Sequence, residues 1–174
     1  MKYLVKLFVI TFFLIISTYS YAEQKIVVLD MNYILNQSKA GKGAQDFLKK
    51  TFKENQKIFV EQEKILKKEE SDLLGKKNVL TKEDYKKESA ELRKKVIKYQ
   101  TLRRAALDKI TSQRADSRKK LLANIEPLLN SYIKENNISL VIDKKNMLGG
   151  SSDLDITKII AEKLDKELPS LNLK

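Results

Sequence analysis

Two short apolar runs with the length and composition of β-strands lie near opposite ends of the chain. Residues 26–30 read Ile-Val-Val-Leu-Asp and residues 139–143 read Ser-Leu-Val-Ile-Asp, and β-branched runs of this kind favour strands. A further helix is expected near residues 156–168. Two or three short strands and one helix cannot cover both faces of a sheet, and so small a sheet is marginal alone. We therefore expect protomers to share strands, with the order of the oligomer left open by the pattern.

The long segment between these runs has the composition of two helices. Residues 43–74 and 82–134 contain one helix breaker, Pro127, and no internal glycine. The predicted fold class is α+β and mostly α, with a helical hairpin at 41–135 that projects as an arm from a small β-body. The β-body is predicted to consist of residues 23–40 and 136–174.

The sequence between the two helices predicts the tip of the hairpin, near residues 75–81. Gly75 suits the C-cap of the first helix, because glycine readily adopts the conformation in which many helices end. Thr81, with Asp84 three residues later, forms an approximate capping box for the second helix. A helix stop followed directly by a restart is typical of an αα-hairpin.

The heptad pattern of the arm predicts a thin interface between its two helices. In the first helix one apolar line recurs every seven residues, at Phe52, Phe59, Leu66 and Leu73. The alternate line that a coiled coil requires is mostly polar, at Leu48, Asn55, Gln62 and Glu69. In the second helix the two lines are Tyr85, Leu92, Tyr99 and Ala106, and Ser89, Val96, Arg103 and Ile110. Such a hairpin can hold itself together but packs poorly, and we expect it to flex.

The N-terminus has the three parts of a cleavable export signal. Two lysines precede an apolar run at 7–16, and Ser20 and Ala22 place small residues where a signal peptidase requires them. The run has about ten strongly apolar residues, against roughly twenty for a membrane span, so a retained anchor is the weaker alternative. We predict that residues 1–22 are removed, that the mature chain begins at Glu23, and that it resides in the periplasm.

Composition limits the chemistry that is available to this chain. It has a net charge of +12 at pH 7 and contains no Cys, His or Trp, which removes disulfides, most transition-metal sites and the usual general base. No phosphate-binding glycine loop or nucleophile motif is present. Asp153 and Asp155 could suggest a metal loop, but helix capping by Ser152 or Asp155 before Ile156 is the stronger interpretation. We therefore predict no enzyme activity, no catalytic residue, no metal and no cofactor.

The strongest charge signal lies on the second helix, between residues 93 and 120. Eleven basic residues stand against two acidic ones there, and a continuous positive field usually meets an anion; a merely solvated helix face is the alternative. Nucleic acid is the common partner of such a helix, but an exported chain does not meet it, which leaves acidic polypeptides and anionic lipid. For the aromatic residues of the arm, packing within the interface is the favoured alternative to binding. The predicted contact residues are Arg93, Arg103, Arg104, Arg114, Arg118, Phe52, Phe59 and Tyr99.

Four stretches of the mature chain resemble the Skp/OmpH family of periplasmic chaperones. They are the first strand at 25–31, the entry to the arm at 38–42, the second strand at 138–143 and the Asp-Ile-Thr that opens the last helix at 155–157. Their order, the long basic hairpin between them and the export signal together carry the resemblance.

The resemblance implies a jellyfish-like homotrimer, in which three arms project around a cavity from a β-body that the protomers share. It also implies ATP-independent holding of unfolded outer-membrane β-barrel proteins in the periplasm. Together with the under-covered sheet, it predicts that Val28, Leu140 and Ile142 face the shared β-core. Two features depart from the family: residues 148–150 stand where a bulkier strand is usual, and the tail at 168–174 continues past the usual helix end.

Two other functions fit parts of the pattern. A structural coiled-coil adaptor between envelope complexes would need a well-filled interface, contrary to Asn55, Gln62 and Glu69. A protein that binds lipopolysaccharide or anionic membrane shares the charge argument, and this could be a second activity of the same arm. Sedimentation with an unfolded barrel protein or with lipid vesicles would separate these alternatives.

Overall fold

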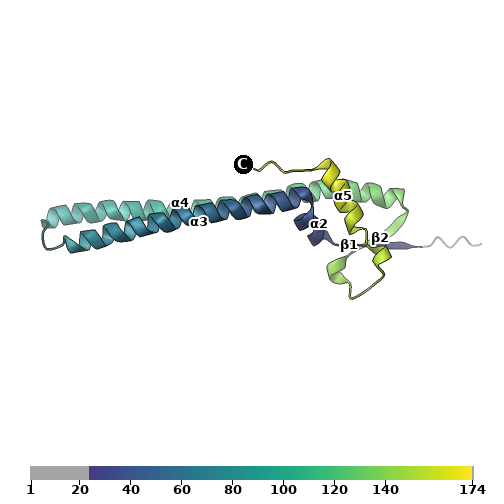
Figure 1. The fold of residues 1–174 in the computed structure, drawn as a ribbon, viewed down its shortest axis with the longest axis horizontal. Helices are drawn as coiled ribbons and strands as arrows, with labels where there is room; N and C mark the ends of the chain where they lie inside the picture. The colour runs from purple at the N-terminus through teal and green to yellow at the C-terminus, as the bar shows by residue number, and fades with distance from the viewer. Residues whose placement is uncertain (1–23, 174) are drawn as a thin grey trace, which may run out of the picture.

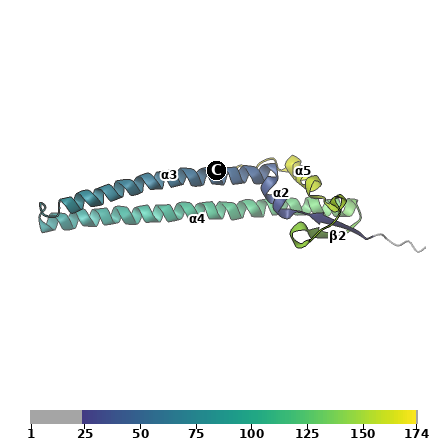
Figure 2. The same cartoon turned by 60° about the horizontal axis from the view of Figure 1, so that its bottom comes forward.

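The structure, a computed structural model, describes residues 24–173. Its elements are β1 (Lys25–Leu29), α2 (Met31–Gln37), α3 (Lys39–Gly75), α4 (Lys82–Glu135), β2 (Ile138–Asp143) and α5 (Thr157–Glu167), with short 3-10 helices at Lys144–Asn146 and Ser152–Leu154. Figure 1 shows α3 and α4 side by side as a long arm, with the sheet, α2 and α5 gathered at one end, and Figure 2 agrees. The predicted fold class, mostly α with a helical hairpin and a small sheet, is confirmed. The predicted signal peptide and its cleavage site at Ala22 and Glu23 lie outside the described residues.

The two strands pair in parallel, since the whole arm serves as the crossover that returns the chain to the same end of the sheet. Paired residues of parallel strands share a face, so Ile26 and Val28 lie on one face with their partners Leu140 and Ile142. The opposite face, which carries Val27, is buried in the main core. The sheet therefore has one face covered by its own chain and one face that is largely open.

The segment after β2 forms no further strand among the described residues. Residues 147–150 are irregular, and Leu148 is fully exposed. Glycines at 149 and 150 offer no side chain to pack, which disfavours a strand at this place. An isolated bridge instead joins Val28 to Asp155, and the Ile156 N–H donates to the Val28 carbonyl oxygen at 2.9 Å.

The main core lies where α2, the base of α4, the sheet and α5 meet. Its buried side chains are Val27, Leu29, Ile34, Leu35, Ala40, Leu121, Ile125, Leu128, Ile138, Ile156, Ile160, Ala161 and Leu164. Side chains cap the two helices that follow β1. Asp30 caps α2 and accepts the Tyr33 N–H at 2.8 Å, and Ser38 caps α3 and accepts the Gly41 N–H at 3.2 Å. The Asp30 N–H donates to Thr157 Oγ1 at 2.8 Å, which joins β1 to α5. The arm therefore projects from a firmly packed base.

The two caps at the tip of the arm differ in how well the sequence predicted them. Thr81 caps α4 as predicted, because its Oγ1 accepts the Asp84 N–H at 3.1 Å and also donates to the Asp84 carboxylate at 2.7 Å. The prediction for Gly75 is wrong: it is the last residue of α3, and the cap is Lys76 with a right-handed φ of −85°. None of the described glycines has a positive φ, so the turn does not need glycine's conformational freedom.

The interface between α3 and α4 is thin, as predicted, but two heptad positions were assigned wrongly. From Leu48 onward, the buried or partly buried side chains of α3 are Leu48, Thr51, Asn55, Phe59, Glu63, Leu66, Glu69 and Leu73. Thr51 thus takes the place of Phe52, and Glu63 takes the place of Gln62. The reason is that a straight helix drifts from a seven-residue repeat by about 20° per heptad. Between Leu48 and Leu73, no side chain of α3 is buried.

The exposed length of α4 mirrors this thin packing. From its start to residue 109, its inward-facing side chains are only partly buried, and full burial begins at Ile110. Polar contacts supplement the apolar ones, since Lys95 Nζ lies 2.8 Å from a carboxylate oxygen of Glu69 across the arm. Exposed ion pairs of this kind contribute about 0–1 kcal/mol. The arm is therefore held by weak contacts along most of its length.

Candidate functional site

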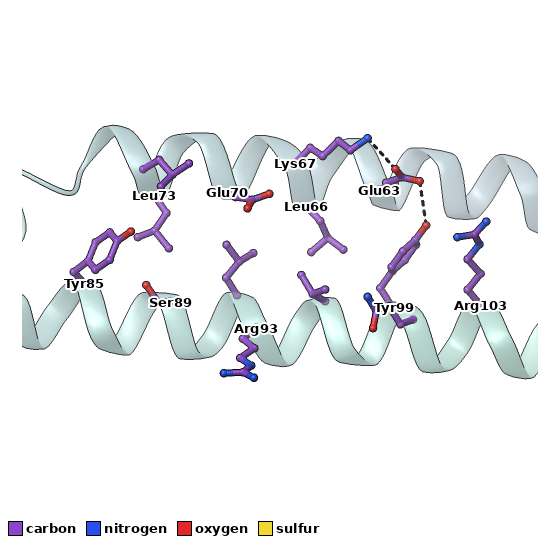
Figure 3. Close-up of a pocket in the computed structure, with 14 residues that line it drawn as sticks. Glu63, Leu66, Lys67, Glu70, Leu73, Tyr85, Ser89, Arg93, Tyr99 and Arg103 are labelled. Atoms are coloured by element: carbon purple, nitrogen blue, oxygen red, sulfur yellow. Dashed lines mark hydrogen bonds and ion pairs between the residues drawn. The ribbon is translucent and has the colours of Figure 1, made fainter.

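Several grooves lie between α3 and α4, and the first considered, called here the outer groove, lies in the tip half of the arm. It has a volume of about 540 Å³. Its floor is apolar, with Leu66 and Leu73 of α3 opposite Leu92 and Val96 of α4. Figure 3 shows the labelled leucines pointing from α3 toward α4. The groove exists because side chains in a thin helix interface leave space that a full coiled-coil seam would fill.

Tyr99 lies at one end of the outer groove and is held there by α3. Its hydroxyl donates to Glu63 Oε2 at 3.3 Å, and Lys67 Nζ lies 2.9 Å from Glu63 Oε1 (Figure 3). The hydrogen bond from Lys67 holds the pKa of Glu63 below its ordinary value and raises the pKa of Lys67. Phe59 packs edge-on against Tyr99, with ring centroids 6.0 Å apart. The Tyr99 ring thus forms a partly exposed apolar wall of the outer groove, and these contacts fix its position.

The second groove, called here the base groove, lies where the arm leaves the body and has a volume of about 580 Å³. Leu48, Ile110 and Leu121 are buried beside it and form its apolar lining. Lys49 of α3 and two arginines of α4 add positive charge to that lining. The arginines are Arg114 and Arg118.

The structure brings the predicted contact residues together in two groups, one in each groove. Arg93, Arg103 and Tyr99 line the outer groove. Phe52, whose side chain is 45% exposed, lines the base groove with the arginine pair Arg114 and Arg118. Phe52 therefore has a different surrounding from the helix interface that the heptad pattern assigned to it.

Two predicted contact residues line neither groove. Phe59 instead contacts the ring of Tyr99. Arg104 is highly exposed and lies 4.0 Å from the Asp108 carboxylate one turn later. Sequence reasoning missed Lys49 and Gln45 of the base groove, because nothing in their spacing distinguishes them from other solvated residues of α3.

The groove arginines make no short ion pair in the described residues, although the charge of Arg103 helps to lower the pKa of Glu63. Within the described residues, Arg93, Arg103, Arg114 and Arg118 form no ion pair, whereas Arg104 pairs with Asp108. All of these side chains are exposed. An unpaired guanidinium keeps its donors and its charge available for an incoming carboxylate or phosphate. The grooves therefore combine an apolar interior with exposed arginines, beside the carboxylates of Glu63 and Glu70 in the outer groove and of Asp46 in the base groove.

A second surface of interest is the open face of the sheet. Leu140 is 51% exposed, Ile26 is 38% exposed, and Ile142 is partly buried. Val28 lies on the same face but is buried. The residues predicted to mediate oligomerisation thus share one face with a further apolar residue, Ile26, and a face of this kind is typical of an interaction site.

The acidic loop before α5 has a structural arrangement. Asp155 Oδ2 lies 2.7 Å from Lys144 Nζ, and its Oδ1 accepts the Thr157 N–H at 2.9 Å. The predicted N-cap is displaced, because the formal cap position is Ile156, which makes no side-chain hydrogen bond, while Asp155 caps from one residue earlier. In residues 24–173, no cluster of three or more metal-ligating His, Cys, Asp or Glu side chains occurs. Within the same range, no helix combines the length and the apolar character needed to cross a membrane.

Comparison with known proteins places this architecture in a family. The model of the family described as "Outer membrane protein (OmpH-like)" matches residues 25–164, from β1 to near the end of α5. The chain belongs to the OmpH-like family. This membership confirms the resemblance drawn from the sequence and supports a chaperone role, in a family that is generally non-enzymatic.

A solved structure supports the same fold for this OmpH-like chain. It is a protein from Caulobacter crescentus, described as a candidate outer membrane chaperone (OmpH-like), with a TM-score of 0.79 and 15% sequence identity. The alignment covers 91% of this chain and 94% of that one. No curated protein matches the sequence. At this identity the likeness establishes the fold, and the more specific function rests on the arm and its grooves.

Proposed function

We propose that this protein is a periplasmic, ATP-independent holding chaperone that binds unfolded outer-membrane β-barrel proteins and keeps them soluble. The observation that carries the proposal is the arm, in which two apolar grooves are lined by arginines without ion-pair partners. Membership of the OmpH-like chaperone family supports it. Unfolded barrel segments alternate apolar and polar residues along the chain, so they can offer apolar side chains to such grooves and acidic ones to the arginines.

The weak packing of the arm suits a holder that must also release. Contacts in the outer groove come from partly buried side chains such as Leu66 and Tyr99, so each apolar contact with a client would be modest. Several modest contacts along a long arm add up, while each can exchange separately. The positive field of α4 speeds the encounter with acidic clients. Binding and release in this scheme need no nucleotide.

Removal of four arginines tests this mechanism. Changing Arg103, Arg104, Arg114 and Arg118 together to Gln should preserve helix content, because Gln is nearly as good a helix former as Arg. Capture of an acidic unfolded barrel protein should weaken at low salt, chiefly through slower association, and the difference should shrink as salt screens the charges. Suppression of client aggregation across a salt series provides the measurement.

A charge-matched control separates groove chemistry from net charge. Four exposed lysines of α3 that line neither groove can be changed to Gln, and they are Lys42, Lys53, Lys57 and Lys68. This variant loses the same charge from outside the grooves, so it should retain most of its capture if the groove arginines contact the client. A loss equal to that of the arginine variant would show that only net charge matters. Equal protection by the wild type and the arginine variant at every salt concentration would show that the arginines only keep the arm soluble.

We further propose that the open sheet face assembles this chain into a homotrimer, with Val28, Leu140 and Ile142 at the shared core. Leu140→Asp is a selective test because Leu140 is half exposed in the single chain, so the charge is strongly penalised only when a partner buries it. Light scattering should show a smaller particle for this variant. Val79→Asp, at the tip of the arm where this side chain is 84% exposed, is the control and should leave the mass unchanged. A wild-type monomer, or an unaltered Leu140→Asp oligomer, would refute the assignment.

The proposed address is the periplasm, which the family description supports. The export signal proposed for residues 1–22 predicts a mature chain that starts at Glu23. Intact-mass measurement of protein isolated from the cell envelope tests this directly. Retention of those residues would point to an anchored protein instead.

Binding of anionic lipid or lipopolysaccharide is the second candidate, and the arginine-lined base groove favours it over the adaptor alternative. An acyl chain and a phosphate group would satisfy the same apolar lining and the same cations, here Arg114 and Arg118. Co-sedimentation with anionic vesicles, with neutral vesicles as the control, measures it. Vesicle binding without any capture of unfolded barrel protein would make lipid the primary ligand.

A further inference from the structure

The C-terminal tail, defined here as Leu168–Leu173, is a part of the chain that the family does not account for. The family match ends at residue 164, and α5 ends at Glu167. Figure 1 shows the yellow tail leaving α5 and running back along the base of the arm, in the direction of the tip. The tail therefore lies beyond the residues that the family model matches, and it returns toward the arm instead of extending into solvent.

The tail is attached by apolar side chains. Its three leucines, at 168, 171 and 173, are all partly buried, whereas the residues between them are exposed. Leu168 and Leu171 pack against the main core cluster, to which α2, α4, α5 and both strands contribute. Pro169 disfavours continuation of the helix. The result is an irregular peptide that presents leucines to an apolar surface.

The backbone of the tail makes only local hydrogen bonds in the described part of the chain. The Leu168 N–H donates to the Leu164 carbonyl oxygen at 2.7 Å, and the Asn172 N–H donates to Ser170 Oγ at 3.1 Å. No strand pairing fixes the tail to the body, so its release breaks side-chain contacts alone.

We propose that the tail occupies an apolar binding site at the base of the arm, and that an extended apolar segment of a client displaces it. The inference rests on the proposed holding function and names one place where a client binds. The tail shows the chemistry that this site accepts: a non-helical peptide with leucines at short intervals and small polar residues between them. Unfolded barrel segments, which alternate apolar and polar residues, have the same character. In the absence of client, the tail shields the site from water and from other copies of the chain.

A single-tryptophan reporter tests displacement. The chain contains no Trp, so Leu171→Trp places one indole at the tail, and an unfolded barrel protein whose tryptophans have been replaced serves as the client. We expect blue-shifted emission from the variant alone and a red shift when client is added, as the indole passes into water. Emission that stays unchanged, or shifts further to the blue, at saturating client would overturn the proposal.

Affinity provides an independent test. In the double variant Leu168→Ser and Leu171→Ser the tail no longer competes with the client for the site, so the client should bind more tightly. If the site is free in about a tenth of the wild-type molecules, the gain in affinity should be roughly tenfold. The measurement is made at high salt, where the arginines are screened. Asn172→Gly keeps both leucines and tolerates the positive φ of 49° at this residue, so this control should bind as the wild type does.

The outcomes separate this inference from the proposed function. Equal or weaker client binding by the double variant overturns the tail site, and so does a loss of helix content, which would make the tail a fixed part of the core. Capture of client by neither the wild type nor the double variant would overturn the holding function itself.

Discussion

Replacing leucine with alanine at three positions would measure how stability is divided between the body and the arm. Leu164 of α5 is fully buried in the main core, Leu66 of α3 is partly buried in the outer groove, and Leu102 of α4 is 47% exposed. Each replacement removes the same carbon atoms from a helix. Differences in the free energy of unfolding therefore report on the surroundings of each site.

The expected losses follow from burial. Three buried carbons contribute about 2.4 kcal/mol at roughly 0.8 each, and the cavity left in a closed core brings Leu164→Ala to about 3–5 kcal/mol. At Leu66 part of that surface is already hydrated and the groove admits water, so the loss should be about 1–2 kcal/mol. Leu102→Ala should stay within roughly 0.5 kcal/mol, as surface substitutions usually do.

Urea unfolding followed by far-ultraviolet circular dichroism provides the assay, with all variants at one protein concentration because assembly would add to the apparent stability. The slope of the transition should be unchanged among the variants. If Leu66→Ala costs as much as Leu164→Ala, the arm is packed as tightly as the body. The grooves would then not be loose, client-accessible surfaces.

Two further predictions concern the base of the arm. Gly41→Ala should destabilise the protein by about 1–3 kcal/mol, because the new Cβ would clash with the Leu35 carbonyl oxygen. Gly43→Ala meets open space and should stabilise the protein by up to about 1 kcal/mol. Thermal unfolding of both variants checks this, and equal effects on stability would contradict it. Burial raises the pKa of Asp155, but hydrogen bonds from Lys144 and from the backbone outweigh burial and hold that pKa below its ordinary value. The stability that this ionised carboxylate contributes is present above about pH 4 and is lost as pH falls through the depressed pKa. Asp155→Asn should therefore reduce the acid-induced fall in melting temperature. An unchanged dependence of melting temperature on pH would refute this contribution of Asp155.

Much of the fold could be predicted because its signals are local. A β-branched run such as 26–30 favours extended backbone wherever it lies, and a long stretch without Gly or Pro favours helix. The Thr81 cap was predictable for the same reason, since its partner lies three residues away. The positive charge of α4 is likewise a property of composition, which tertiary structure can redistribute but not remove.

The candidate site was only partly predictable, because its grooves combine residues that are distant along the chain. Phe52 and Arg114 meet at the base groove only because the hairpin brings α3 and α4 together in one register. That register also decided that Glu63 faces Tyr99, which a strict heptad reading placed one residue away.

The sequence by itself determined the two arm helices, α5, the strands, the tip of the arm and its basic face, because short-range sterics, capping and charge are sufficient for these. It did not predict the short helix α2. Only the tertiary structure decided that the strands pair in parallel, that Leu140 is left exposed, and that the tail at Leu168–Leu173 returns to the core. Each of these depends on where a crossover or a chain end lies in space. Local conformational preferences carry no information about these positions in space, which are decided by the packing of the whole chain.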